Sequence, residues 1–520
     1  MSGRATRTPG RRMAALWAAI AGVVSGGIFL ASAELVALLV ARESDPLIAV
    51  GSFVIDIVPR WAKELAIELF GSNDKLFLLT TVAVAAFAAA AIAGLLELRF
   101  RWAGVALFGV AGIAAIAAAV TRAGASGLAF LPPTVGALLG AGALWLLIGR
   151  LKLWRADQTR GGDARPDRRT FLLLTGSAAA LSLLVGVGSR ALSSASSSVA
   201  AIRKALRLPS PQNRVAVPAG ADLRIPGLSP LFTPNADFYR VDTALSVPSI
   251  DPATWRLVID GMVEKRVEIT FDQLLAMGLR EYAITLTCVS NQVGGNLVGN
   301  ARWLGVPVRE LLARARPRRG ADMVLSRSID GFTASSPLEA LTDSGRDAIL
   351  AVGMNGEPLP LEHGFPVRMV VPGLYGYVSA TKWLTELKVT TYAADQAYWT
   401  PRGYSAKAPI KLSSRIDTPR LDKAIPAGQA VIAGVAWAQT VGIGKVEVQI
   451  DGGEWQQAAL STPIGKDTWV QWSLPWNATT GSHTLSVRAT DLAGRLQEQK
   501  RTAIAPDGST GWQSTLVRVE

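Results

Sequence analysis

The sequence predicts a multi-domain chain: an all-α bundle of about five transmembrane spans, then an α+β domain, then a C-terminal β-sandwich. A mean hydropathy of +0.28 with 49% hydrophobic residues is too apolar for a soluble chain, and the excess falls before residue 190. After residue 233 short apolar runs alternate with helical stretches. The last part of the chain alternates apolar and polar residues between turn signals, which is typical of antiparallel strands.

Five apolar stretches each approach the ~20 residues that a bilayer crossing requires. They are 13–41, 76–96, 102–121, 129–149 and 171–189. The segments 47–58 and 61–70 are too short or too amphipathic to cross, so we expect them at the outer interface. Lys and Arg gather before the first span, between the second and third, and before the fifth. By the positive-inside rule these segments face the cytoplasm, and everything after residue 190 lies outside a bacterial cell membrane.

The net charge of +13 follows in large part from this topology, because residues 1–170 hold 18 Lys and Arg against 11 Asp and Glu. No nucleic-acid motif accompanies the basic composition, so we expect no nucleic-acid partner. The fifth span follows the run Asp167-Arg168-Arg169-Thr170-Phe171-Leu172-Leu173. This run fits a twin-arginine export signal, which would carry a folded domain across the membrane, and it equally fits ordinary flanking charge.

The chain divides into four predicted parts: residues 1–190 in the membrane, a linker at 191–233, an α+β domain at 234–400 and a β-sandwich at 401–520. The linker is polar, small and rich in Pro and Gly. The last part holds at least five alternating strands in about 110 residues, the density of an immunoglobulin-like sandwich. We expect its tryptophans in the core or at an interface.

Cys288 is the only cysteine in 520 residues. A lone cysteine on a strand is more often a small buried hydrophobe than a ligand. In an exported protein, however, an unpaired thiol forms no internal disulfide and risks oxidation, so its retention needs a reason. Coordination of a soft metal supplies one. A cysteine nucleophile acting with His363 is the competing hypothesis, which the surrounding residues fit poorly.

Those surroundings resemble the sulfite oxidase family of molybdopterin-dependent oxidoreductases, in ordered blocks over residues 235–520. The first block, NADFYR, holds Asn235, Phe238, Tyr239 and Arg240. The resemblance places it near the cofactor, with Arg240 as the cation on the substrate side. The second block is LTC-x-x-N, in which Cys288 would give its thiolate to molybdenum.

The remaining blocks imply contacts to the pterin cofactor. In the second block Asn291 would support the cysteine loop, and in LEHGFPVRMVVPG both His363 and Arg368 would hold the pterin phosphate. A final loop, GLYGYVSATKWL, would place Ser379 and Lys382 against the pterin. A weaker candidate contact is Ser328 after the strand DMVL, and Tyr404 after Trp399 aligns with the family's active-site tyrosine or is a packing aromatic.

One departure bears on the substrate. Animal sulfite oxidases carry two arginines after the asparagine of the cysteine loop, where this chain has Gln292-Val293. Three functions therefore stay open: oxygen-atom transfer to sulfite or a related sulfur compound, reduction of a sulfoxide such as methionine sulfoxide with the same cofactor, and a non-catalytic membrane-anchored binding module.

The two histidines limit the electron path. His363 and His483 both lie in the predicted exported part, so we expect no b-type haem in the membrane bundle. Electrons are expected to pass to a separate carrier, a c-type cytochrome or a membrane redox protein. The resemblance also implies a homodimer through the C-terminal domain.

Overall fold

The computed structural model describes residues 11–40, 49–51, 53–54, 58, 74–121, 127–159, 165–193, 196–420 and 423–520. The chain forms two compact units, residues 1–197 with 244–246 and residues 198–243 with 247–520. The predicted interfacial segment 61–70 lies outside the described residues, as does half of 47–58.

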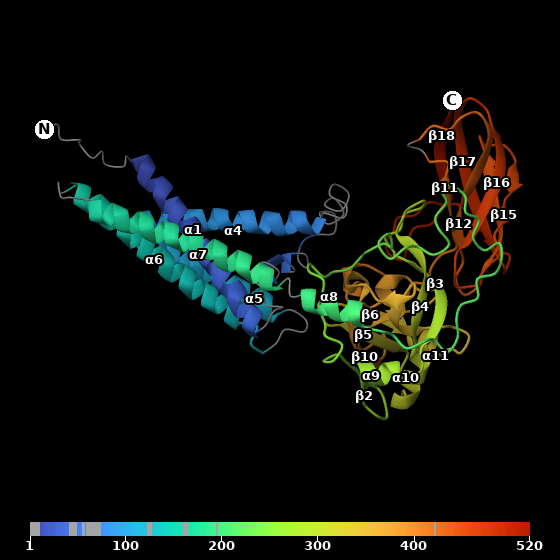
Figure 1. Ribbon diagram of the computed structural model, residues 1–520, viewed down its shortest axis with the longest axis horizontal. Helices are drawn as coiled ribbons and strands as arrows, with labels where there is room; N and C mark the ends of the chain where they lie inside the picture. The colour runs from blue at the N-terminus through green and yellow to red at the C-terminus, as the bar shows by residue number, and fades with distance from the viewer. Residues whose placement is uncertain are drawn as a thin grey trace. The chain divides into compact units, whose positions relative to one another are not determined.

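The first unit is helical (Figure 1). Its long helices are α1 (Arg11–Val40), α4 (Asp74–Arg99), α5 (Ala103–Val120), α6 (Leu131–Thr159) and α7 (Arg165–Ser193). All five contain a stretch long and apolar enough to cross a membrane: Arg12–Val40, Phe77–Arg99, Ala103–Val120, Leu131–Ala156 and Arg168–Gly186. These stretches agree with the five spans that the sequence predicts.

Small residues let the helices of this bundle approach closely. A Cβ added at Gly22 of α1 would lie 2.0 Å from the Ala90 carbonyl oxygen of α4. One added at Gly94 of α4 would lie 2.0 Å from the Ala18 carbonyl oxygen of α1. In lipid, where apolar burial does not drive helices together, such close backbone packing contributes much of the association.

The predicted twin-arginine run lies in the first turns of α7. Arg168 and Arg169 are exposed, whereas Phe171 is fully buried. The Phe171 ring packs 5.8 Å from the Trp17 ring and 5.9 Å from the Trp154 ring, measured between centroids. The apolar residue that follows the arginine pair is therefore part of the bundle core.

Residues 191–233 contain more regular structure than the linker prediction implies. Helix α8 (Ser196–Ala205) forms within this segment, and Val199 on it joins the core of the second unit. Its Arg203 guanidinium donates to the Leu359 and Pro358 carbonyls at 2.7 Å each. Most of the described residues of this helix other than Val199 are exposed, so its contact with the core follows from tertiary packing and not from an apolar sequence pattern.

The α+β part of the second unit contains two sheets. The first has the strand order β2-β1-β10-β5-β6. Its strands are β1 (Arg256–Gly261), β2 (Val267–Thr270), β5 (Met323–Ser328), β6 (Thr333–Pro337) and β10 (Leu384–Thr390). Strands β1 and β10 run parallel, and the other neighbours in this sheet are antiparallel.

The second sheet has the order β3-β4-β7-β8, with β9 paired to β7. Its strands are β3 (Arg280–Thr287), β4 (Val298–Pro307), β7 (Ile349–Met354), β8 (Glu357–Pro358) and β9 (Arg368–Val370). Short helices connect the strands: α9 (Phe271–Leu275), α10 (Val308–Ala315), α11 (Leu338–Thr342), η3 (Leu361–His363), η4 (Gly376–Val378) and η5 (Thr400–Arg402). Candidate site residues lie on or beside the ends of these strands and short helices.

The C-terminal part consists of two four-stranded sheets, β11-β12-β16-β15 and β14-β13-β17-β18. The strands are β11 (Ser413–Thr418), β12 (Gly428–Trp437), β13 (Ile443–Ile450), β14 (Trp455–Gln457), β15 (Ala459–Leu460), β16 (Val470–Ala478), β17 (Gly481–Asp491) and β18 (Gln513–Val519). One apolar core joins them, with Ile432 and Trp472 from the first sheet and Val446 and Leu485 from the second. The two sheets therefore pack face to face as a sandwich.

The sandwich contacts the α+β part at the loop that follows β3. The Ser509 hydroxyl donates to the Asn291 carbonyl at 2.8 Å, and the Arg415 guanidinium donates to the Gly295 carbonyl at 2.8 Å. Arg415 also pairs with Asp417 at 2.6 Å, and both side chains are nearly buried. The loop is thus held from outside its own sheet.

Candidate active site

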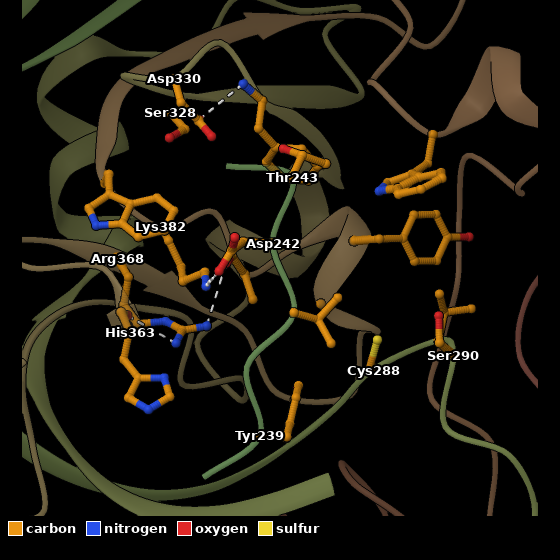
Figure 2. Close-up of a pocket in the computed structure, with 18 of the residues that line it drawn as sticks. Tyr239, Asp242, Thr243, Cys288, Ser290, Ser328, Asp330, His363, Arg368 and Lys382 are labelled. Carbon is orange, nitrogen blue, oxygen red and sulfur yellow. Dashed lines mark hydrogen bonds and ion pairs between the residues drawn. The ribbon is translucent and has the colours of Figure 1, made fainter. Parts of the chain in front are cut away.

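A pocket in the second unit collects side chains from segments far apart in the sequence (Figure 2). Its lining combines aromatic rings, one thiol and a few charged groups. These residues are Phe238, Tyr239, Val241, Asp242, Thr243, Cys288, Val289, Ser290, Ser328, Asp330, Phe332, His363, Arg368, Gly376, Tyr377, Ala380, Lys382, Trp383, Trp399 and Tyr404. A concave, mainly apolar lining with few polar groups is typical of small-molecule and cofactor sites.

Cys288 directly follows β3 and begins a tight loop. Its N–H donates to the Leu297 carbonyl at 2.9 Å, and its own carbonyl accepts from the Asn291 N–H at 3.0 Å. The Asn291 side-chain oxygen in turn accepts from the Leu297 N–H at 2.9 Å. Burial raises the pKa of the Cys288 thiol, opposed by hydrogen bonds from Ser290. The thiol would therefore ionise readily only with an additional positive partner such as a metal.

Arg368, at the start of β9, is a buried cation with weak compensation. Its guanidinium donates to the carbonyls of His363 at 3.2 Å and Ala380 at 3.5 Å, and it lies 5.1 Å from the centre of the Trp303 ring. Its Nε has no hydrogen-bond partner. Burial lowers the pKa of Arg368 to about 10, with a small opposing effect of Tyr239. An anion at this point would relieve the cost of burying the charge.

His363 lies beside this arginine at the end of η3. Its Nε2 is 3.1 Å from the Asn235 carbonyl oxygen, and its ring contacts the Phe238 ring edge-on at 5.6 Å. Burial, together with Arg368, lowers the pKa of His363 to about 4. The imidazole is therefore neutral at physiological pH and acts as a hydrogen-bonding group.

A second cluster of charges surrounds Asp242. One carboxylate oxygen of this buried residue accepts from Lys382 Nζ at 2.7 Å and from Arg240 Nε at 2.9 Å. Burial lowers the pKa of Lys382 to about 8, opposed by Asp242. The carboxylate thus offsets much of the positive charge that these two basic residues bring to the pocket.

The structure brings most of the predicted site residues together. The pocket lining includes Phe238, Tyr239, Cys288, Ser328, His363, Arg368, Lys382 and Tyr404. In Figure 2, Arg368 and His363 lie together beside Lys382, and Cys288 lies apart from them near Ser290. The buried hydroxyl of Ser328 has no hydrogen-bond partner among the residues that the structure describes, which leaves it available to a ligand.

Four predicted residues do not line the pocket. The Asn235 side-chain amide donates to the Met354 carbonyl and the Glu357 carboxylate, and its backbone carbonyl contacts His363 Nε2. The other three are Arg240, which pairs with Asp242, Asn291, which closes the cysteine loop, and Ser379. The Ser379 hydroxyl donates to the Tyr375 carbonyl at 2.9 Å and is fully buried in the turn.

Sequence reasoning missed several lining residues. Asp242 stands two positions after the predicted Arg240, and its role depends on Lys382, which is 140 residues away. Asp330 and Phe332 follow Ser328 in a turn where the Phe332 N–H donates to the Asp330 carboxylate at 3.3 Å. The nearest sequence signal was the run IDGF after the strand, which marks a turn and no ligand.

The donor set around Cys288 restricts how a metal would be held. Within the described ranges, no group of three or more His, Cys, Asp and Glu side chains is placed to hold a metal ion. A metal bound by Cys288 therefore needs its remaining ligands from another molecule. A cofactor that brings its own sulfur donors meets this requirement.

Comparisons with known proteins agree with the site. Residues 244–399 match the family described as oxidoreductase molybdopterin binding domain. The mitochondrial sulfite oxidase of Rattus norvegicus is 30% identical over 270 residues, which cover 44% of this chain and 49% of the relative. Nitrate reductase [NADH] of Solanum lycopersicum is 28% identical over 321 residues, covering 49% of this chain and 35% of the relative.

Among solved structures, the sulfane dehydrogenase SoxCD from Paracoccus pantotrophus aligns with a TM-score of 0.49 and 24% identity, over 56% of this chain and 84% of that chain. The chain spans about half the length of the sulfite oxidase from Rattus norvegicus. The matched region contains Cys288, His363, Arg368 and Lys382. Residues 244–399 therefore form a molybdopterin-binding oxidoreductase domain, and the chain that contains them is similar to the sulfite oxidases.

Proposed function

We propose that this protein is a membrane-anchored, molybdopterin-dependent oxidoreductase that transfers an oxygen atom to or from a sulfur compound. The observation that carries the proposal is the pairing, in one pocket, of a lone thiol with a buried arginine whose Nε has no hydrogen-bond partner among the described residues. The family supplies the cofactor, and the relatives named as sulfite oxidases supply the substrate class.

The residues present fit a molybdenum-pterin cofactor. Arg368 Nε and the Ser328 hydroxyl are buried in the pocket without partners, and both suit phosphate oxygens. His363 is a neutral hydrogen-bonding group beside Arg368. Cys288 supplies a soft sulfur ligand, and the other metal ligands would come from the cofactor's dithiolene.

In this assignment each side chain has a limited task. Cys288 would hold the metal, while Arg368 and Ser328 would hold the phosphate. Lys382, fixed by Asp242, would contact the pterin. Tyr404 lines the pocket and would donate a hydrogen bond to the substrate. When bound, the cofactor supplies the two-electron redox chemistry, and the protein supplies position and charge.

Two directions of reaction fit this site. Oxidation of sulfite, or of a related sulfur compound, releases two electrons and two protons as water supplies the oxygen. Reduction of a sulfoxide such as methionine sulfoxide consumes two electrons and two protons and releases water. The replacement of two arginines by Gln292-Val293 beside the cysteine loop supports an uncharged substrate.

The proposed location is the outer side of a bacterial cell membrane. Five apolar helices precede the catalytic domain, and the basic residues before the odd-numbered spans support a cytoplasmic N-terminus. Arg168 and Arg169 would then serve folded export, since the cofactor is inserted before the domain crosses the membrane. Electrons would leave to, or arrive from, a separate carrier such as a c-type cytochrome, with no haem bound in the bundle.

The C-terminal sandwich is proposed to be immunoglobulin-like and to form a homodimer. Two four-stranded sheets with one shared core support the first part of this proposal. The dimer rests on family resemblance. Light scattering of the detergent-solubilised protein tests it, because a monomer would contradict the dimer.

Two assays test the function. The protein, purified with its cofactor, is assayed for sulfite-dependent reduction of cytochrome c and for reduction of methionine sulfoxide by a reduced viologen dye. Turnover in either assay supports oxygen-atom transfer at sulfur. Full molybdenum loading without turnover in either assay would favour the remaining alternative, a non-catalytic binding module.

A further inference from the structure

Helix α8 contacts an edge strand of the second sheet. The strand order β3-β4-β7-β8 leaves β8 at the end of the sheet. Arg203 on α8 donates from Nε to the Leu359 carbonyl and from Nη2 to the Pro358 carbonyl, at 2.7 Å each. Nη2 also donates to the Glu357 carboxylate at 3.0 Å. One guanidinium therefore binds three consecutive residues on an edge where backbone groups otherwise lack a neighbouring strand.

The Glu357 carboxylate extends this contact toward the pocket. Its Oε2 accepts from Arg203, while its Oε1 accepts from the Asn235 side-chain amide at 2.6 Å. The Asn235 side-chain oxygen accepts from Asn355 at 2.9 Å, so both ends of this side chain are engaged. The Asn235 backbone carbonyl then lies 3.1 Å from His363 Nε2. Because a carbonyl oxygen only accepts, the proton of the neutral imidazole lies on Nε2.

The short helix η3 connects the same segment to the cations of the pocket. It begins two residues after Leu359, and each of its three carbonyls accepts from a side chain that lines the pocket. The donors and acceptors are Trp383 Nε1 to Leu361 at 2.9 Å, Lys382 Nζ to Glu362 at 3.0 Å and Arg368 Nη1 to His363 at 3.2 Å. The position of η3 therefore determines how these charges face a ligand (Figure 2).

From these contacts we infer that Arg203 is a positioning residue of the active site. It holds the β8 segment, which through Asn235 and η3 orients His363 and Arg368 toward the cofactor phosphate. Arg203 does not line the pocket, and α8 lies outside residues 244–399, which match the molybdopterin-binding family. The inference rests on the proposed function, since it concerns the same cofactor. It adds that retention of the cofactor depends on a helix that precedes the catalytic domain.

The two histidines of the chain allow this relay to be observed without the cofactor. Full-length protein made without the cofactor and labelled with ¹⁵N-histidine gives two imidazole spin systems, which His363→Asn assigns. We expect Arg203→Ala to shift the His363 signals and to leave those of His483, in the sandwich, unchanged. Glu357→Ala removes only the carboxylate bridge and should shift the same signals. Arg203→Lys keeps one charged donor and should return them toward the parental position.

Lys204→Ala is the matched control. Lys204 follows Arg203 on α8 and is exposed, so its loss removes the same charge from the same helix. It should leave both imidazole signals unchanged. A role of Arg203 limited to fixing α8 would also leave the His363 signals unchanged, because the imidazole is reached only through Glu357 and Asn235.

Cofactor release gives a second reading that requires no turnover. The loaded protein is diluted in detergent, and the pterin lost to solution is followed by the fluorescence of its oxidised form. We expect release from Arg203→Ala to be about tenfold faster than from the parent, because a misplaced Arg368 loses roughly one hydrogen bond to a charged group. Lys204→Ala should release the cofactor at the parental rate.

The outcomes distinguish this inference from the proposed function. Unchanged His363 signals in folded Arg203→Ala and Glu357→Ala, or a parental rate of cofactor release from Arg203→Ala, would overturn the inference and leave the proposed function intact. If Arg203→Ala does not fold, Glu357→Ala alone decides by the same two measurements. A parent that acquires no pterin, although the cofactor is available, would reject the proposed function. The His363 signals of the cofactor-free protein would then still show whether Arg203 acts on the site.

Discussion

Replacement of Arg368 by glutamine tests the assignment of this residue to the cofactor phosphate. In the cofactor-free protein, two opposing effects of Arg368→Gln nearly cancel. Burial lowers the pKa of Arg368 from 12.5 to about 10, which corresponds to a cost of about 3 kcal/mol for holding the charge in the folded protein. Against this, the variant loses two hydrogen bonds to carbonyls and the contact with the Trp303 ring, together about 2–3 kcal/mol.

We therefore expect the free energy of unfolding of the cofactor-free Arg368→Gln variant to lie within about 1 kcal/mol of the parent. Cofactor binding should respond far more strongly. Two hydrogen bonds from a guanidinium to a phosphate contribute about 3 kcal/mol, so the affinity for the pterin should fall roughly 100-fold. The assays are urea unfolding of protein made without the cofactor and pterin content of protein made with it.

Arg327→Gln is the matched control for this experiment. Arg327 lies on β5 and pairs with Glu386 at 2.8 Å, with 37% of its side chain exposed. Its loss should change neither pterin content nor stability by a large amount. Two results would show that Arg368 is a structural residue and that the phosphate assignment is wrong. One is that Arg368→Gln retains the parental pterin content; the other is that it lowers the free energy of unfolding of the cofactor-free protein by about 3 kcal/mol or more.

Three further predictions concern the thiol, the contact of the sandwich with the cysteine loop, and the buried imidazole. Cys288→Ser should abolish turnover in both redox assays, because a hydroxyl is a poor substitute for a soft thiolate; full activity would end the ligand assignment. Arg415→Met should destabilise the protein by about 3–5 kcal/mol in urea unfolding, since it leaves the buried Asp417 carboxylate without its cationic partner, and a change below about 1 kcal/mol would contradict this. Because folding lowers the pKa of His363 from 6.5 to about 4, the unfolded chain binds more protons between these values, and the free energy of unfolding should fall by up to about 3 kcal/mol as the pH drops from 6.5 to 4. His363→Asn should lack this component of the pH dependence, and an unchanged pH profile would show that His363 is not buried as a neutral group.

Local composition was enough to predict much of this molecule. Each stretch long and apolar enough to cross a membrane is one continuous run of apolar residues, so its position can be predicted without knowledge of packing. Likewise Cys288, His363, Arg368 and Lys382 occur in distinctive sequence blocks, and the structure brings all four to one pocket.

Contacts between residues far apart in the chain could not be predicted from the sequence. Arg240 was expected in the pocket, but Asp242 engages its guanidinium beside Lys382, 140 residues further along the chain. Ser379 lies in the expected loop, but its hydroxyl donates to the Tyr375 carbonyl of its own turn instead of facing the pocket lining. Helix α8 lies in a segment predicted to be a linker, and Val199 and Arg203 on it contact residues of the α+β domain. Such contacts are set by tertiary packing, which composition does not encode.

Metal and pterin analysis of the purified chain tests the central claim most directly. The full-length protein and Cys288→Ser are expressed in a host that makes molybdopterin, and molybdenum is measured by mass spectrometry beside the oxidised pterin by fluorescence. The account predicts close to one molybdenum and one pterin per chain in the parent, with less molybdenum in the variant. A parent protein that contains neither, although it is folded and the cofactor was available, would contradict the account.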